Sequence, residues 1–275
     1  MPTNDPRPTK AQRRDDARAK ALQLRAEQKR RERRNRILAI ASLGVAVALL
    51  GVVVVFILHQ GGNKTTTAAT ALLADVNRPA ISTTTGGIPY TQGAPAALDG
   101  NKIKTTTGVP VVSVYSDFMC PNCGNFESVN HADLDALQAS GAIVLDYHPI
   151  AILDNSSTTQ YSTRSAQAVA AVASLDPAHF VAFYDSLFVN QPTEGGAGLT
   201  DQELASRALA AGVTQEAVDS FSKGTFTPWA GAATQQATKD GVQGTPTVVI
   251  NGTTWSGNWS TAGELKKAIE AAAKG

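Results

Sequence analysis

The sequence predicts an α/β domain joined to one N-terminal transmembrane helix. Three observations lead to this prediction: an uncharged apolar run of 22 residues, two cysteines placed where a strand gives way to a helix, and a strand hairpin followed by a final helix. The chain has 275 residues, of which 43% are hydrophobic and 17% charged. This composition excludes a disordered chain, a collagen and a multi-span membrane protein.

The first 36 residues differ in charge from the remainder. They hold 13 of the 24 Lys and Arg residues and 5 of the 23 acidic ones, a net charge of +8, which leaves −7 for the rest of the chain. We expect residues 1–36 to form a basic cytoplasmic tail that touches anionic lipid. Nucleic-acid binding is the alternative, but the tail lacks interleaved aromatic residues and a recognisable motif, so no nucleic-acid partner is expected.

Residues 37–58 predict the membrane anchor. As a helix these 22 residues span roughly 33 Å, enough for a hydrocarbon core of about 30 Å. Five arginines at positions 30–36 stand directly before the run, and such a cluster stays cytoplasmic and directs the following chain across the membrane. A cleavable signal peptide is the alternative, although its apolar region is usually shorter and closely followed by a cleavage site.

Residues 59–86 are rich in Thr, Gly and Ala and predict a flexible tether, the later part of which packs on the following domain. Residues 87–275 then form the domain outside the cytoplasm. The predicted location is therefore the cell membrane, with a single pass, a cytoplasmic N-terminus and an extracytoplasmic C-terminal domain.

Within this domain, apolar runs predict strands at 111–115 and 142–147, on either side of a helix that begins at the cysteines and ends near Gly141. A long helical stretch follows. Asp176 with Pro177 is expected at one helix start, Thr200 with Glu203 forms an expected capping box, and Gly212 suits a helix end. Asn251-Gly252 is expected to join hairpin strands at 246–250 and 253–255. Thr261 with Glu264 is expected at the start of the last helix.

The only cysteines, Cys120 and Cys123, form a Cys-Pro-Asn-Cys motif. At the start of a helix, free N–H groups and the helix dipole stabilise a thiolate at Cys120. Cys123 lies one turn later, where we expect it to be more buried and to resolve a mixed disulfide. Pro121 suits the first helical turn, where its missing N–H costs nothing.

Two other interpretations of the cysteine pair remain. An inert structural disulfide is one, although so small a ring stabilises a chain little. A structural zinc site is the other, but it needs two more ligands, and His131, His148 and His179 lack metal-site spacing. The spacing therefore favours redox chemistry, and no metal is expected.

A second motif, Gly244-Thr245-Pro246-Thr247, opens a predicted strand far downstream. Taken alone, Pro246 is typical of an edge strand. Together with a dithiol at a strand–helix junction, it predicts a cis-proline loop that faces the thiols.

The segments VYSDFMCPNCGNFE and GVQGTPTVVINGTTWSG resemble the DsbA-like thioredoxin-fold thiol–disulfide oxidoreductases, in particular the membrane-anchored members of actinobacteria. The resemblance covers roughly residues 87–274. It implies a thioredoxin fold with an inserted α-helical domain at about 155–240, preceded here by the transmembrane helix. It also implies that Cys120 exchanges with the substrate and Cys123 resolves, while Thr245 and Pro246 hold the substrate chain extended beside the sulfurs.

The resemblance leaves alternatives open for three residues, Asp117, Asn122 and Thr245. Asp117 either tunes the thiols and relays protons or only caps the helix. Asn122 stands where the strong oxidant of the class has His, so it offers no imidazolium charge to a thiolate. Thr245 before Pro246 resembles some isomerase and reductase members.

The predicted function is extracytoplasmic exchange of disulfides with secreted or membrane proteins through a mixed disulfide at Cys120, acting as an oxidase. No cofactor is expected because the cysteine pair is itself the redox group, and a membrane redox partner must recycle it. The alternatives are a reductase or isomerase of extracytoplasmic disulfides, and a non-catalytic thioredoxin-fold binding module.

Overall fold

The computed structural model describes residues 73–274. The predicted tail (1–36), the predicted anchor (37–58) and the first part of the predicted tether lie outside the described residues. Among residues 73–274, none of the helices has the length and apolar character needed to span a membrane.

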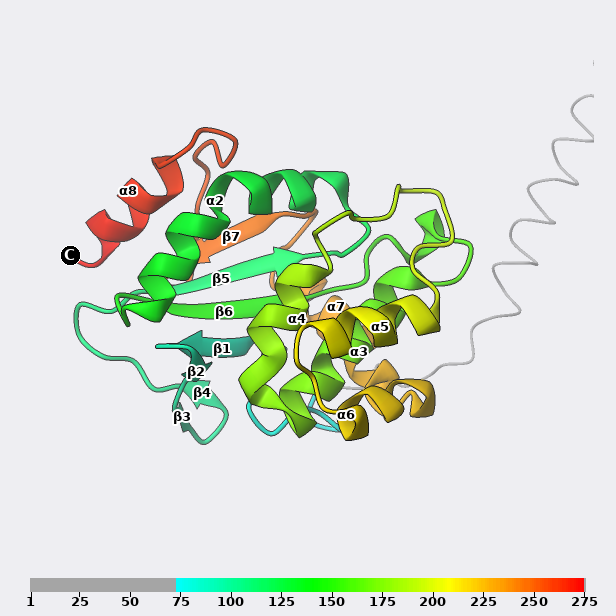
Figure 1. The fold of residues 1–275 in the computed structure, drawn as a ribbon. Coiled ribbons are helices and arrows are strands. Elements are labelled where there is room, and N and C mark those ends of the chain that lie inside the picture. Colours follow the sequence, from blue (N-terminus) through cyan, green and yellow to red (C-terminus); the bar gives the residue numbers. More distant parts are fainter. Residues whose placement is uncertain (1–72, 275) are drawn as a thin grey trace, which may run out of the picture. The chain divides into compact units, whose positions relative to one another are not determined.

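A six-stranded sheet with the strand order β2-β1-β6-β5-β7-β8 forms the centre of the domain (Figure 1). The central strands β5 and β6 are parallel, whereas β1 pairs antiparallel with β6, and β7 pairs antiparallel with β5. The strands of this sheet are β1 (Ile88–Thr91), β2 (Ala94–Pro95), β5 (Val111–Ser116), β6 (Val144–Pro149), β7 (Thr247–Ile250) and β8 (Thr253–Thr254). Strands β3 (Leu98–Asp99) and β4 (Lys102–Ile103) form a separate pair.

Helix α2 follows β5, helix α8 ends the chain, and the other helices lie between β6 and β7 (Figure 1). The α-helices are α2 (Pro121–Ala139), α3 (Tyr161–Leu175), α4 (Phe180–Ser186), α5 (Asp201–Ala210), α6 (Gln215–Asp219), α7 (Thr227–Lys239) and α8 (Glu264–Ala272). Short 3-10 turns lie at Asp154–Ser156, Pro177–His179 and Phe221–Lys223. The helical insertion expected between the strands is therefore present, and its proposed bounds of 155–240 remain a prediction.

Alternation along β5 assigns the helices to the two faces of the sheet, because successive strand residues point to opposite sides. Val114 lines a small cavity together with α2 residues, whereas its neighbour Tyr115 packs with Ala237 of α7. Helices α2 and α7 therefore cover opposite faces. Every residue of β6 is buried, as a central strand covered on both sides requires.

Aromatic side chains join the insertion to the sheet. Tyr90 of β1 stacks on Phe180 of α4 with ring centroids 4.9 Å apart, and Tyr147 of β6 meets Tyr184 of α4 edge to face at 4.7 Å. Helix α4 therefore packs on this part of the sheet, and α2 lies on the same face because Tyr147 and α2 residues line one cavity.

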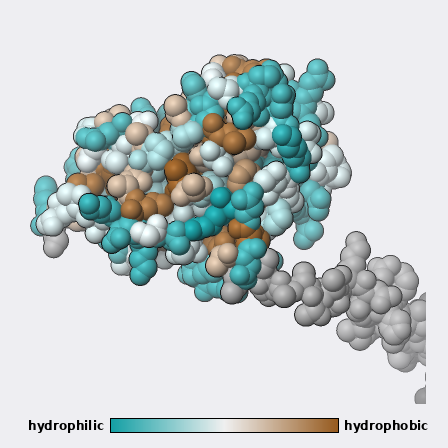
Figure 2. Space-filling view, turned by 90° about the horizontal axis from the view of Figure 1, so that it is seen from below, coloured by the Kyte–Doolittle hydropathy of each residue, from teal (hydrophilic) through white to brown (hydrophobic). Residues whose placement is uncertain are grey.

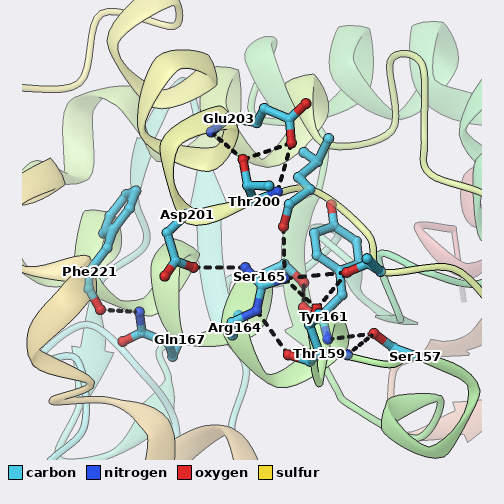
Figure 3. A network of polar contacts seen from close by, with 12 residues as sticks. Ser157, Thr159, Tyr161, Arg164, Ser165, Gln167, Thr200, Asp201, Glu203 and Phe221 are labelled. Carbon is cyan, nitrogen blue, oxygen red and sulfur yellow. Dashed lines mark hydrogen bonds and ion pairs between the residues drawn. The ribbon is translucent and has the colours of Figure 1, made fainter.

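Polar contacts hold the helices of the insertion together (Figure 3). Arg164 of α3 forms an ion pair with Asp201 at the start of α5, with 2.7 Å between Nη1 and Oδ1, and it also donates to the carbonyl oxygen of Leu199. The capping box predicted for Thr200 and Glu203 is confirmed, since each side chain accepts the backbone N–H of the other residue. Asp201 is thus held where Arg164 can reach it.

Two predicted helix starts differ in detail from the structure. Asp176 is the N-cap residue and Pro177 opens the turn, as predicted, but this turn is a 3-10 helix that precedes α4. The Asp176 carboxylate does not cap it and instead accepts the backbone N–H of Thr214 and contacts Nδ1 of His179. Thr261 and Glu264 form no capping box, because Gly263 is the N-cap of α8 with φ of 75°. The Glu264 carboxylate accepts the N–H of Asn258 instead.

The described part of the predicted tether packs on the domain, as expected of its later part. Leu73 belongs to the hydrophobic core, and Ser82 and Thr83 are buried. On the face seen in Figure 2, hydrophilic side chains separate the apolar patches. Such a mixed surface is ordinary for a domain that has buried its large apolar side chains.

Candidate active site

The cysteine pair lies where β5 ends and α2 begins, as predicted. Cys120 is the N-cap residue with an extended backbone, Pro121 occupies the first turn, and no side chain caps the helix. The backbone N–H groups of Asn122 and Cys123, in the first turn of α2, act on the Cys120 sulfur. Both cysteines are free thiols; Cys120 is 6% exposed and Cys123 is fully buried.

The two thiols differ strongly in acidity. The pKa of Cys120 is lowered most by a hydrogen bond from the Cys123 thiol. Burial opposes this effect, whereas hydrogen bonds from the Thr245 hydroxyl and from the backbone N–H groups of Cys123 and Asn122 add to it. The resulting pKa of Cys120 is about 6. Burial raises the pKa of Cys123 far above its ordinary value. At neutral pH Cys120 is therefore the thiolate, and Cys123 keeps its proton.

The proline loop faces the cysteines. The peptide bond between Thr245 and Pro246 is cis, and the Thr245 carbonyl oxygen lies 3.3 Å from the Cys120 sulfur, where it accepts a hydrogen bond from the protonated thiol. The loop is only partly buried at both residues. The downstream motif is thus brought directly beside the dithiol.

Asp117 lies behind the active-site turn and is fully buried. Its carboxylate accepts the N–H of Met119 at 2.9 Å, the N–H of Leu153 at 2.9 Å and the Ser162 hydroxyl at 2.7 Å. These bonds leave α2 uncapped, so the helix-capping interpretation of Asp117 is not realised. Burial raises the pKa of Asp117 to about 6; its three hydrogen bonds oppose this rise, and the charge of Cys120 adds to it.

The other two predicted supporting residues are on the surface. Pro121 and Asn122 are exposed, and Asn122 acts on the Cys120 thiolate through its backbone N–H. The lowered pKa of Cys120 therefore arises from the dithiol, the threonine and the helix N-terminus, without an imidazolium at position 122.

Gln191 is a residue of the site that the sequence analysis did not identify. It follows α4, and its amide Nε2 donates to the carbonyl oxygens of Phe118 and Cys120, both at 2.9 Å. Its Oε1 lies 2.4 Å from the place a Cβ would occupy at Gly124. The insertion thus holds the active-site turn from outside, and Gly124 leaves room for that contact.

The family model described as Thioredoxin matches residues 106–271, more than half of the chain. The chain therefore belongs to this thioredoxin family. Within it, the solved structures that resemble the chain define a narrower class, the DsbA-like thiol–disulfide oxidoreductases.

Several of these structures come from Mycobacterium tuberculosis. Oxidised DsbA is 30% identical with a TM-score of 0.57, and the alignment covers 68% of this chain and 92% of DsbA. Reduced DsbG is 31% identical with a TM-score of 0.56, covering 67% of this chain and 86% of DsbG. BdbD from Bacillus subtilis has a TM-score of 0.56 at 21% identity, covering 73% of this chain and 98% of BdbD, and shows the shared fold alone.

Curated relatives include the serine/threonine-protein kinase PknE of Mycobacterium tuberculosis and Mycobacterium bovis. The match is 31% identical over 131 residues and covers 46% of this chain but 23% of the kinase. The chain therefore spans less than a quarter of the length of the curated relatives it matches.

Proposed function

We propose that this protein is a membrane-anchored oxidase of thiols in secreted or membrane proteins, working outside the cytoplasm through the Cys120–Cys123 pair. The observation that supports this most directly is the unequal acidity of the two thiols. Cys120 has its pKa lowered to about 6 at the edge of the surface, whereas the pKa of the fully buried Cys123 is raised. A thiolate at the first position makes Cys120 the sulfur that exchanges with a substrate.

In the proposed reaction the oxidised pair is a disulfide. A substrate thiolate attacks the Cys120 sulfur, the disulfide breaks, and Cys123 leaves and takes up a proton. A second substrate thiolate then attacks the substrate sulfur of the mixed disulfide and releases Cys120 as a thiolate. Two electrons pass from the substrate dithiol to the cysteine pair, and the substrate gains a disulfide.

The pKa of Cys120 supports the oxidising direction. About 6 lies between the values of about 7 for thioredoxin and about 3.5 for DsbA. We expect a reduction potential between those of the same two proteins, about −270 and −120 mV, whereas structural disulfides of secreted proteins lie below about −300 mV. Exchange would therefore run towards the substrate disulfide as long as a membrane redox partner keeps the pair oxidised.

The proline loop supplies the proposed contact with the substrate chain. Thr245 and Pro246 are partly exposed beside the Cys120 sulfur. An extended peptide that pairs with this loop would bring its own cysteine next to Cys120, as in strand addition to a sheet edge. The basic tail at 1–36 and the uncharged run at 37–58 support an anchor with the domain outside the cytoplasm.

The deciding measurement is the reduction potential of the full-length protein, equilibrated with glutathione. A value between about −120 and −270 mV, together with formation of disulfides in a reduced secreted protein, is the expected result. A value at or below that of thioredoxin would point to a reductase, and loss of any reversible disulfide would leave a binding module.

A trapping experiment separates exchange from simple binding. Cys123→Ser removes the resolving thiol, so substrates should accumulate as mixed disulfides on Cys120 that a reductant releases. Cys120→Ser, the matched control, should trap nothing because the buried Cys123 cannot be reached. Equal recovery of partners by both variants would favour the binding module.

A further inference from the structure

A cluster of ionisable side chains lies between the active-site helix and the helical insertion, apart from the dithiol. Glu127 and His131 stand four residues apart on α2 and so share one face of the helix. Asp185 of α4 faces them. The potential ligand atoms of all three lie within 4.8 Å of one another, with His131 Nδ1 at 3.7 Å from Glu127 Oε2 and 3.8 Å from Asp185 Oδ1.

These separations fit a metal ion between the three side chains. With metal–ligand bonds of about 2.0–2.1 Å, tetrahedral ligands lie about 3.3–3.4 Å from each other. The two measured pairs are a few tenths of an ångström wider. Since Glu127 and His131 have rotatable side chains, and the His131 side chain is 46% exposed, a small contraction would close the site without backbone movement.

The charge of the cluster also calls for a cation. A third carboxylate, Asp135, lines the same cavity. Among the described residues, the ion pairs of Glu127 and Asp185 involve only His131, and Asp135 has none. Three carboxylates are thus grouped around a single imidazole, and partly buried charges of one sign are stabilised by a cation.

An independent observation comes from the floor of the cluster. Tyr147 of β6 is 6% exposed, and no hydrogen bond among the described residues uses its hydroxyl. It lines a cavity of about 10 Å³ together with Glu127, His131, Asp135 and Asp185, which is room for one water-sized particle. The side chain of Tyr147 thus lies against the same small cavity as the three carboxylates.

An entry path leads to the same side chains. A groove of about 270 Å³ opens beside the cluster, lined by Glu127, His131 and Asp185 together with Gly124, Ser128, Phe188 and Val189. An ion held by three protein ligands keeps an open position for water, and this groove would hold that water.

We propose that Glu127, His131 and Asp185 bind one divalent transition-metal ion of the Zn²⁺ class. Asp135 and Tyr147 line the same cavity and are outer partners of these ligands, without binding the ion themselves. A mixed set of one imidazole and carboxylates suits Zn²⁺ better than Ca²⁺ or Mg²⁺, which take oxygen ligands alone. The ion links α2, which carries the cysteines, to α4 of the insertion. No metal was expected from the sequence, because His131, His148 and His179 lack metal-site spacing. Asp185 belongs to a different helix from the other two ligands, so the sequence pattern did not reveal this site.

The test is calorimetric titration with Zn²⁺ of the full-length protein, prepared without a histidine tag and freed of metal by a chelator. Because the dithiol itself would bind Zn²⁺, the titration uses a Cys120→Ser/Cys123→Ser background, and is repeated on disulfide-oxidised protein of unaltered sequence. We expect one ion per chain and a rise in the melting temperature on addition of Zn²⁺.

Variants then locate the ion. Glu127→Gln and Asp185→Asn should each weaken binding by more than about 100-fold, and Tyr147→Phe by about tenfold, because even outer partners of metal ligands are worth about 10–100-fold in affinity. Glu216→Gln, the matched control on an exposed site of α6, should bind as the parent does. Circular dichroism verifies folding, and His131→Gln replaces any ligand variant that fails to fold.

Several results would overturn the proposal. These are absence of Zn²⁺ binding, binding that survives both Glu127→Gln and Asp185→Asn, or stronger binding of Ca²⁺ than of Zn²⁺. A lysine-rich peptide that binds with the same dependence on Glu127, in a protein that does not bind Zn²⁺, would also overturn it and identify the cluster as a subsite for basic side chains.

Discussion

The Cys120 sulfur and the Thr245 carbonyl oxygen lie 3.3 Å apart, although 125 residues separate them in the chain. The Thr245 hydroxyl is buried next to this contact and, among residues 73–274, has no hydrogen-bond partner while the thiols are neutral. It lowers the pKa of Cys120 because it can donate to the thiolate. One threonine therefore faces the redox sulfur with both an acceptor and a donor.

The first prediction concerns this donor. Absorbance of the reduced protein at 240 nm should report a thiolate that forms with a midpoint near pH 6, and Thr245→Val should raise that midpoint because the donor is lost while the shape is kept. Thr253→Val, on an exposed position of β8, is the control and should leave the midpoint unchanged. A midpoint near 9 in the parent protein would contradict the prediction.

The second prediction is a dependence of stability on pH in the reduced protein. The pKa of Cys120 is lowered from 9.0 to about 6 by folding, so the thiolate favours the folded state above pH 9 and this stabilisation is lost as the pH falls through 6. The free energy of unfolding of the reduced protein, measured with urea, should therefore rise between pH 6 and 9 relative to Cys120→Ser. A constant difference would show that folding leaves the thiol pKa unaltered.

Asp117 should show the opposite sign. Its pKa is raised from 3.8 to about 6, so folding favours the protonated carboxyl, a stabilisation present below pH 3.8 and lost as the pH rises through 6. In the Cys120→Ser background, stability relative to Asp117→Asn should fall between pH 4 and 6. Asp219→Asn, on an exposed carboxylate of α6, provides the control. A rise over that interval would rule out the raised pKa.

The sequence was sufficient where local geometry decides the outcome. The cysteines at the start of α2, the positive φ values of 49° and 80° at Asn251 and Gly252 in the hairpin, and the capping box at Thr200 all depend on residues close in the chain. The cis bond at Pro246 was also anticipated, through its pairing with the cysteine motif.

The sequence was insufficient where partners come from distant elements. Gln191 reaches the active-site turn from the segment after α4, and Ser162 reaches Asp117 from α3. Polar residues in helical stretches have no pattern that identifies such contacts. Asp176 is the N-cap residue of the turn before α4, as predicted, but a tertiary bond from the Thr214 N–H occupies its carboxylate. Thr261 fits the rules for a helix cap, but the left-handed Gly263 is the N-cap of α8.

The two threonines predicted to cap helices offer a direct comparison. Thr200→Ala removes the bond that the Glu203 N–H makes to the threonine side chain and should lower the free energy of unfolding by about 1 kcal/mol. Thr261→Ala should cost less, because Gly263 is the N-cap of α8. Urea denaturation of both variants measures the difference. Equal losses would mean that the capping geometry does not decide stability.

The last prediction tests the hydrogen bonds by which Gln191 of the insertion holds the active-site turn. Gln191→Ala removes two hydrogen bonds, to the carbonyl oxygens of Phe118 and Cys120, and should lower the free energy of unfolding by about 1–2 kcal/mol. Gly124→Ala alone should also destabilise, since its Cβ would lie 2.4 Å from Gln191 Oε1. In the Gln191→Ala background the same glycine substitution should instead stabilise by about 0.5–1 kcal/mol, because alanine favours a helix over glycine. This reversal of sign, measured in a double-mutant cycle with urea, would not occur if Gln191 lay elsewhere in solution.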